Sequence, residues 1–77
     1  MDALKQRITI DEDILGGKPV IRGMRISVEQ ILRAMAAGVP QDDLLADYPE
    51  LEPDDILAVF VYAADMIGET RVYPVAI

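Results

Sequence analysis

Residues 53–68 limit most strongly what this chain can fold into, because they predict a long helix that is apolar on more than one face. Pro53 followed by two aspartates is typical of a helix start, and Gly68 is expected to end the helix. Between residues 56 and 67, Asp65 is the one charged residue. A helix with this composition needs neighbours on more than one side. One apolar stripe comprises Ile56, Val59, Phe60, Ala63 and Ile67, and a second comprises Leu57, Val61 and Ala64.

The chain has 77 residues, which is too few to cover both stripes of that helix. It contains no cysteine and no histidine, which excludes disulfides and the common structural zinc sites as sources of stability. We therefore expect the protein to form a homodimer or a larger assembly, or to dock on another protein. The candidate oligomer interface consists of Leu57, Val61 and Ala64.

Two shorter helices are expected before the long one. Ser27, with Gln30 three residues later, has the pattern of a capping box, and Gly38 is well placed to end the helix that Ser27 begins. A second helix of about two turns has Pro40 in its first turn and stops before Pro49. The order of short helix, turn and longer helix is that of a helix-turn-helix.

The N-terminal residues predict a β-hairpin. Residues 7–10 alternate polar and apolar side chains, Gly16 and Gly17 favour a turn, and residues 20–22 form a second short extended piece after Pro19. The predicted fold is therefore a single, mainly α domain. It has a hairpin head (1–26), a three-helix, homeodomain-like body (27–68) and a short extended tail (69–77).

The tail is the expected contact with a partner protein. It is too apolar for a free, solvated segment, and its alternating side chains suit a strand that adds to the sheet edge of another protein. Tyr73 is the expected anchor, because aromatic residues are enriched among interface hot spots. The candidate partner contacts are Arg71, Val72, Tyr73, Val75 and Ile77.

Charge divides the chain into two unlike parts. The formal charge of −7 is made up of +1 in residues 1–33 and −8 in residues 34–77. An acidic body repels nucleic acid and attracts basic proteins, so DNA binding is expected to be weak, or to need a partner. The cations of the head could contact phosphate or carboxylate groups, or could simply neutralise the neighbouring acidic body. These cations are Lys18, Arg22 and Arg25, together with Arg33 on the helix that follows the head.

Catalytic, metal-binding and cofactor-binding residues are not expected. Gly16-Gly17-Lys18 is followed by proline and lacks the glycine spacing of a phosphate-binding loop. The paired aspartates at 42–43 and 54–55 stand at helix starts, where they complement the helix dipole without any chemistry. We therefore expect a non-enzymatic protein that needs no cofactor.

Nothing in the sequence predicts a membrane segment or a signal peptide. The most apolar run, residues 56–64, is far shorter than the roughly 20 residues that span a bilayer. We expect a soluble, cytoplasmic protein.

Residues 14–26, ILGGKPVIRGMRI, closely resemble the hallmark GGKPVIRGTRI of a prokaryotic family, domain-of-unknown-function family 433. The resemblance continues through residues 38–40 and 47–51 and ends near residue 64. It implies a β-hairpin followed by a three-helix, homeodomain-like body. It also implies an antitoxin of the VapB type, which binds a PIN-like ribonuclease toxin and represses its own promoter together with it. Met24 departs from the hallmark threonine, and the tail lies outside the shared pattern.

Three functions remain open at this point. The first is an antitoxin-like protein that neutralises a PIN-like ribonuclease through its apolar, acidic C-terminal half. The second is a DNA-binding regulator that uses the basic head, and the third is a structural homodimer without an enzyme partner. DNA binding that weakens steeply with salt would favour the second function. Co-purification with a small basic protein would favour the first.

Overall fold

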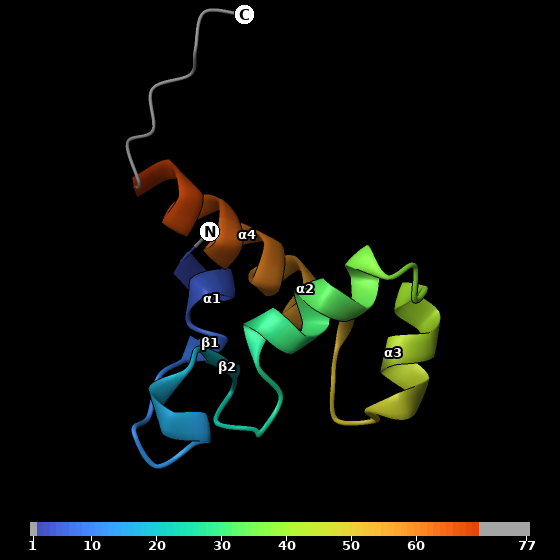
Figure 1. The fold of residues 1–77 in the computed structure, drawn as a ribbon, viewed down its shortest axis with the longest axis horizontal. Coiled ribbons are helices and arrows are strands. Elements are labelled where there is room, and N and C mark those ends of the chain that lie inside the picture. Colours follow the sequence, from blue (N-terminus) through green and yellow to red (C-terminus); the bar gives the residue numbers. More distant parts are fainter. Residues whose placement is uncertain (1, 70–77) are drawn as a thin grey trace, which may run out of the picture.

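The structure is a computed structural model that describes residues 2–69 (Figure 1). It confirms the predicted fold class, a mainly helical domain that carries an N-terminal β-hairpin. The helix α1 and the 3-10 turn η1 were not predicted. In chain order the elements are α1 (Asp2–Lys5), β1 (Ile8–Thr9), η1 (Leu15–Gly17), β2 (Val20–Ile21), α2 (Val28–Ala36), α3 (Gln41–Asp47) and α4 (Pro53–Glu69).

The hairpin is short but is held on both sides of β2. Strands β1 and β2 are antiparallel, with Ile8 opposite Ile21 and Thr9 opposite Val20. On its other side, β2 approaches the start of α2, because Val20 forms an isolated bridge with Ser27. The side chains of Val20 and Ile21 are completely buried. A pair of two-residue strands would be marginal alone, and this burial against the helices compensates.

The prediction that Arg22 continues the second strand is wrong. Its backbone turns into the left-handed region with φ 43°, and Gly23 follows with φ 70°. The backbone N–H of Gly23 then donates a hydrogen bond of 2.9 Å to Thr9 Oγ1, which fastens the turn to β1. Such a backbone is uncommon outside glycine and requires compensating contacts. The ion pairs that Arg22 makes with α4, described below, supply them.

Helix α2 begins and ends as its sequence predicts. Ser27 Oγ accepts a 2.9 Å hydrogen bond from the N–H of Gln30, which is half of a capping box. The Gln30 side chain does not return to Ser27 and instead donates to Tyr48 Oη at 3.0 Å, which links α2 to the end of α3. Gly38 has φ 91°, the left-handed backbone that favours glycine at a helix end.

The last two helices differ from prediction by single residues. Pro40 is the N-cap of α3 and does not lie in its first turn. Helix α4 starts at Pro53 as predicted, but it continues through Gly68 to Glu69, so Gly68 does not end it. Unlike Gly38, Gly68 is not among the glycines with a positive φ, so it lacks the left-handed backbone of a helix end.

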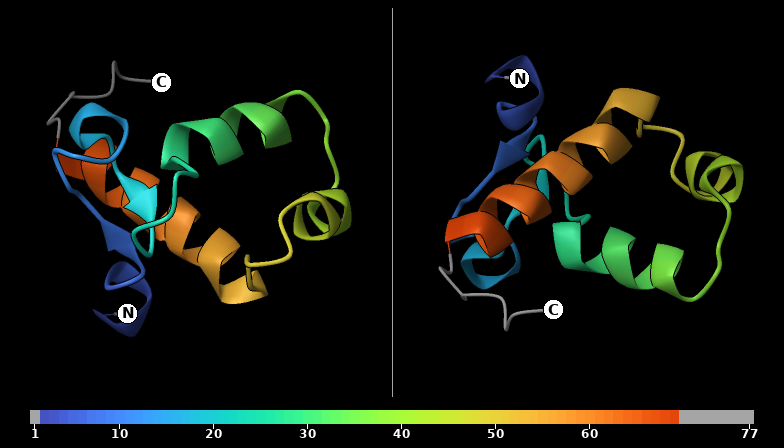
Figure 2. Two further views of the ribbon diagram at one scale, coloured as in Figure 1. Left: turned by 90° about the horizontal axis from the view of Figure 1, so that it is seen from below. Right: turned by 90° about the horizontal axis from the view of Figure 1, so that it is seen from above.

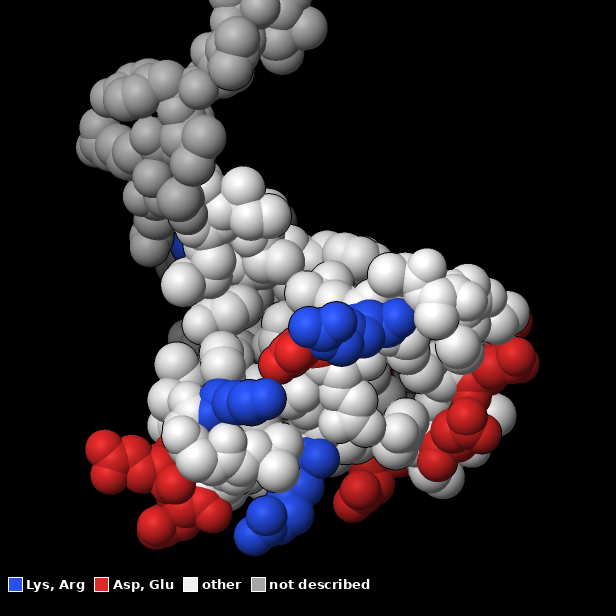
Figure 3. Space-filling model, in the orientation of Figure 1, with Lys and Arg blue, Asp and Glu red and all other residues white. Residues whose placement is uncertain are grey.

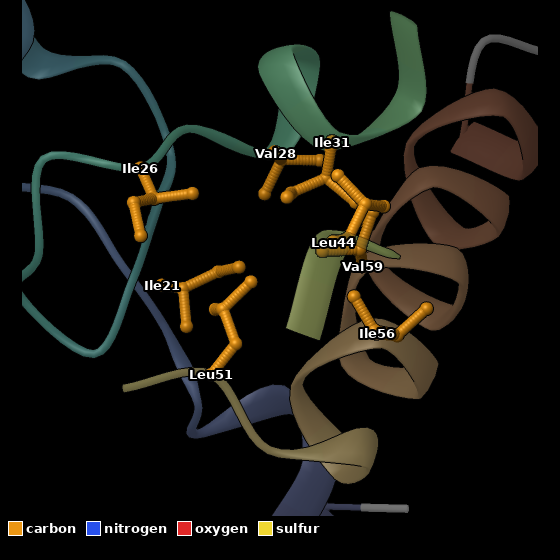
Figure 4. Close-up of a cluster of buried hydrophobic side chains, with 8 residues drawn as sticks. All are labelled: Ile21, Ile26, Val28, Ile31, Leu44, Leu51, Ile56 and Val59. Atoms are coloured by element: carbon orange, nitrogen blue, oxygen red, sulfur yellow. The ribbon is translucent and has the colours of Figure 1, made fainter. Parts of the chain in front are cut away.

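Helices α2, α3 and α4 enclose one core. Helix α3 lies at the end of the molecule where α2 finishes and α4 begins, and the hairpin lies on the side of the C-terminal half of α4 (Figure 2). The hairpin, every helix of the body and the loop before α4 contribute to the core, which Figure 4 shows. Its buried residues are Ile21, Ile26, Val28, Ile31, Leu44, Leu51, Ile56 and Val59.

Candidate protein-binding surface of helix α4

Helix α4 is buried at its start and largely uncovered toward its end. Ile56, Ala58 and Val59 are completely or almost completely buried. Beyond them the body is too small to cover the helix, as its sequence predicts. Four large apolar side chains of α4 remain exposed: Leu57 at 52%, Phe60 at 45%, Met66 at 48% and Ile67 at 74%.

One row of these side chains faces away from the core, and we call it the outer stripe. It consists of Leu57, Phe60, Ala64 and Ile67, which are spaced by three, four and three residues and therefore share one helix face. All four are exposed. Of the predicted oligomer interface, Leu57 and Ala64 thus lie on the surface, whereas Val61 is half-buried. Phe60, and not Val61, is the exposed residue between Leu57 and Ala64 in the outer stripe.

The inward side of α4 borders a groove of about 440 Å³, which we call the α2–α4 groove. Its walls are mainly apolar and include Leu32 of α2 and Tyr62, Ala63, Met66 and Ile67 of α4, so that Ile67 borders both the groove and the outer stripe. Figure 3 shows this face, with charged side chains beside the white surface of α4. Those at the border of the groove are Lys18, Glu29 and Arg33.

Glu29 holds both cations at the groove border. Lys18 Nζ lies 3.1 Å from one of its carboxylate oxygens, and Arg33 Nε donates to the other at 2.9 Å. The hydrogen bonds from Arg33 and Lys18 lower the pKa of Glu29, so it is ionised at neutral pH. All three side chains are exposed, so these pairs contribute little stability. They leave the border with one unbalanced positive charge.

The carboxylate of Asp55 accepts four hydrogen bonds, and we call this arrangement the Asp55 clasp. The Asp55 side chain is completely buried in the first turn of α4. Arg22 donates to both carboxylate oxygens, from Nε at 3.0 Å and from Nη2 at 2.8 Å, and Arg7 Nη1 donates to Oδ1 at 2.9 Å. The backbone N–H of Glu52 donates to Oδ2 at 2.8 Å. The clasp therefore joins both strand ends of the hairpin to α4.

Four hydrogen bonds decide the charge of Asp55. Burial alone would raise its pKa, but the hydrogen bonds from Arg22, from the Glu52 N–H and from Arg7 outweigh burial and lower the pKa below its ordinary value. Asp55 is therefore a carboxylate. Its oxygens are fully used within the chain, so it has no capacity left for a ligand.

The four cations predicted as candidate contacts are not one open cluster. Lys18 and Arg33 are held by Glu29, and Arg22 is held by Asp55 and also donates to the carbonyl oxygen of Glu50 at 2.7 Å. Arg25 is exposed and makes no ion pair within residues 2–69. Three of the four therefore form ion pairs with carboxylates of the chain itself.

Sequence reasoning missed two features of this surface. It assigned Asp55 to helix-dipole complementation only, and nothing in the local pattern revealed its partners 33 and 48 residues away. It also divided Phe60 and Leu57 between different stripes, although a spacing of 57, 60, 64 and 67 was a readable signal. The predicted partner contacts Arg71, Val72, Tyr73, Val75 and Ile77 lie outside the described residues.

Other kinds of site are not found in the described part of the chain. Among residues 2–69, no three acidic side chains gather in a way that could hold a metal ion. None of the described helices is long and apolar enough to cross a bilayer.

The structure thus defines a small helical domain whose hairpin is clasped to its last helix and whose last helix is partly uncovered. Residues 8–63 match the family described as a protein of unknown function, DUF433, and the chain belongs to this family. A crystal structure of a DUF433 member from Anabaena variabilis ATCC 29413 shares the fold, with a TM-score of 0.77 and 31% sequence identity. That match covers 88% of this chain and 67% of the Anabaena chain.

A longer relative contains a similar sequence. The uncharacterized protein y4eO of Sinorhizobium fredii (strain NBRC 101917 / NGR234) is 34% identical over an alignment of 73 residues that covers 92% of this chain. The chain spans only 33% of the length of y4eO. The family match ends at residue 63, so Met66, Ile67 and the residues after α4 lie outside it.

Proposed function

We propose that this protein is a non-enzymatic, antitoxin-like protein that binds and neutralises a PIN-like ribonuclease. The observation that carries the proposal is the uncovered surface of α4, which exposes Phe60, Met66 and Ile67 on an otherwise charged, acidic protein. Monomeric proteins rarely leave large apolar side chains together on their surface without a binding role. The toxin and the self-repression of the promoter come from the resemblance of residues 14–26 to the family hallmark.

Charge supports a basic partner. Helix α3 and its surroundings are strongly acidic, and the side chains of Asp42, Asp43 and Asp47 are exposed. A ribonuclease must attract phosphates, so the entrance to its active site is basic. Acidic helices steer the encounter with such a surface and raise the rate of association. In this proposal the apolar end of α4 and residues 71–77 then supply the buried contacts, with Tyr73 as the anchor.

The test uses the PIN-like protein encoded by an adjoining reading frame, together with the full-length chain. We expect RNA cleavage by that protein to stop when the chain is added in equimolar amount. Deletion of residues 70–77 should loosen the complex severalfold or more while the circular dichroism of the helical body is unchanged. The matched point variants are Tyr73→Ala in the tail and Tyr48→Ala at the far end of α3.

Two results would contradict the proposal. The first is undiminished RNA cleavage in the presence of excess chain. The second is equal weakening of the complex by the two tyrosine substitutions, because Tyr48 is half-buried beside the core at the end of α3 and is not among the proposed partner contacts. If the truncated chain neutralises the ribonuclease as well as the full chain does, only the role of residues 70–77 fails.

Binding of DNA by the isolated chain is the weaker alternative. The start of α4, which would enter the major groove in a helix-turn-helix, exposes the acids Glu52 and Asp54. The cations of the head are mostly engaged, and Arg25 is the exception among those four. We expect weak binding to duplex DNA at physiological salt, and tight, sequence-specific binding by the chain alone would favour a regulator.

A further inference from the structure

We propose that the outer stripe of α4 binds the outer stripe of a second copy of this chain, with the two helices antiparallel. The proposal concerns the isolated chain, and it does not rest on the antitoxin proposal. Three observations support it: the spacing of the stripe, the sizes of its side chains and the charges around it. The area of the stripe limits how strong the contact can be.

The spacing of the stripe is that of a helix–helix seam. Leu57, Phe60, Ala64 and Ile67 follow the alternating three- and four-residue steps of a heptad pattern. At about 1.5 Å per residue, they form a row about 15 Å long. No charged residue interrupts this row, as is usual at the centre of an interface.

The side-chain sizes specify the direction of the partner helix. In an antiparallel pair centred on residue 62, Phe60 of each copy lies opposite Ala64 of the other, and Leu57 lies opposite Ile67. Each large aromatic ring then meets a small residue, which is the alternation that fills a core without cavities. A parallel pair would place Phe60 against Phe60 and leave an empty layer between two Ala64 side chains.

Charge also favours a second copy in this orientation. A protein of net charge −7 repels itself, but Asp65 and Asp54, which lie on α4 near the stripe, each have a basic side chain close by. Lys5 Nζ lies 2.9 Å from Asp65, and Arg7 Nη2 lies 3.7 Å from Asp54. Antiparallel helices place their acidic first turns at opposite ends of the dimer, whereas parallel helices would place them side by side. A strongly basic partner would find more unpaired acids on α3.

The area of the stripe sets the strength of the dimer. From their exposed fractions, the four side chains can bury roughly 400 Å² per protomer, or about 800 Å² in total. Stable dimers bury about 1,200 Å² or more. We therefore expect a reversible dimer with a Kd of roughly 10–100 µM.

Sedimentation equilibrium of the full chain from 5 to 500 µM, values chosen to bracket that roughly estimated Kd, tests the contact. We expect Leu57→Lys and Ile67→Lys each to weaken association about tenfold or more. Ile10→Lys is the matched control, because Ile10 is an equally exposed apolar residue of the hairpin loop and the charge change is the same. Circular dichroism verifies that each variant is folded. A chain that stays monomeric throughout, or a control that dissociates as readily as the stripe variants, overturns the proposal.

Disulfide formation tests the direction, since the natural chain has no cysteine. A mixture of the single variants Phe60→Cys and Ala64→Cys should yield the mixed disulfide in preference to either homodimer. Equal or preferred cross-linking of each variant to itself would indicate parallel helices and overturn the antiparallel arrangement. A monomeric chain would leave the antitoxin proposal standing, because neutralisation of the ribonuclease is measured separately.

Discussion

The substitution Asp55→Asn measures how much the Asp55 clasp contributes to stability. Asparagine keeps the shape of the side chain but removes its charge and replaces one acceptor oxygen by an NH2 group, which is a donor. Arg22 and Arg7 then share a single neutral acceptor. The NH2 group then stands either where Oδ2 accepted the backbone N–H of Glu52 or where Oδ1 accepted hydrogen bonds from both arginines. In either position a donor faces other donors.

The structure bounds the size of the effect. Removing one partner of a fully buried ion pair costs about 3–5 kcal/mol. Here the carboxylate is completely buried, but the side chains of Arg22 and Arg7 are 36% and 25% exposed. Water can therefore hydrate the two arginines in part when they lose the carboxylate, which reduces the loss of stability. We therefore expect a loss of about 2–3 kcal/mol. A domain of this length has a free energy of unfolding of about 4–11 kcal/mol, so the loss is a large fraction.

Urea unfolding at pH 7, followed by circular dichroism at one fixed protein concentration, measures this loss. Asp54→Asn is the matched control, because Asp54 is the neighbouring residue, its side chain is 60% exposed and it lies 3.7 Å from Arg7. The control should change stability by no more than about 0.5 kcal/mol. Equal effects of the two substitutions would refute the conclusion that the clasp anchors the hairpin.

Three further outcomes are expected. Since the pKa of Asp55 is lowered by folding, stability should fall as the pH drops below about 4, and Asp55→Asn should flatten this dependence in acid urea titrations. Ser27→Ala removes the α2 cap and should cost about 1 kcal/mol in urea unfolding, whereas Ser27→Asp retains an acceptor. In fluorescence anisotropy with duplex DNA, Arg25→Ala should reduce any residual binding more than Arg33→Ala, which removes a cation that Glu29 already holds.

The helices could be predicted from the sequence because their signals are local. Ser27, Gly38 and Pro53 each act on the backbone within a few residues. Ser27 is the N-cap of α2, Gly38 follows its C-cap and Pro53 is the first residue of α4, as the sequence predicts. The uncovered face of α4 could also be predicted, because a long apolar helix in a short chain leaves surface to spare.

The clasp and the groove could not be predicted, because they depend on residues far apart in the chain. The sequence predicts that Arg22 ends a strand. Its turned backbone is explained only by its hydrogen bonds to Asp55 of α4, which the local sequence does not reveal. Lys18 and Arg33 read as free cations until the fold brings Glu29 to both of them. α1 was missed because four residues carry too little helical pattern to detect.

The position of Arg22 in the Asp55 clasp bears on what the family hallmark indicates: it indicates how the hairpin is attached to α4, not what the protein binds. Of the charged residues in the glycine-rich hallmark, Arg22 joins the hairpin to α4 and Lys18 forms an ion pair at the surface. Relatives that share the hallmark and also carry an aspartate at the position of Asp55 are expected to fasten the hairpin to the last helix in the same way, whatever they bind. Differences in specificity between relatives should be sought where the hallmark has no influence, in the length and side chains of α4 after residue 63 and in the chain that follows it.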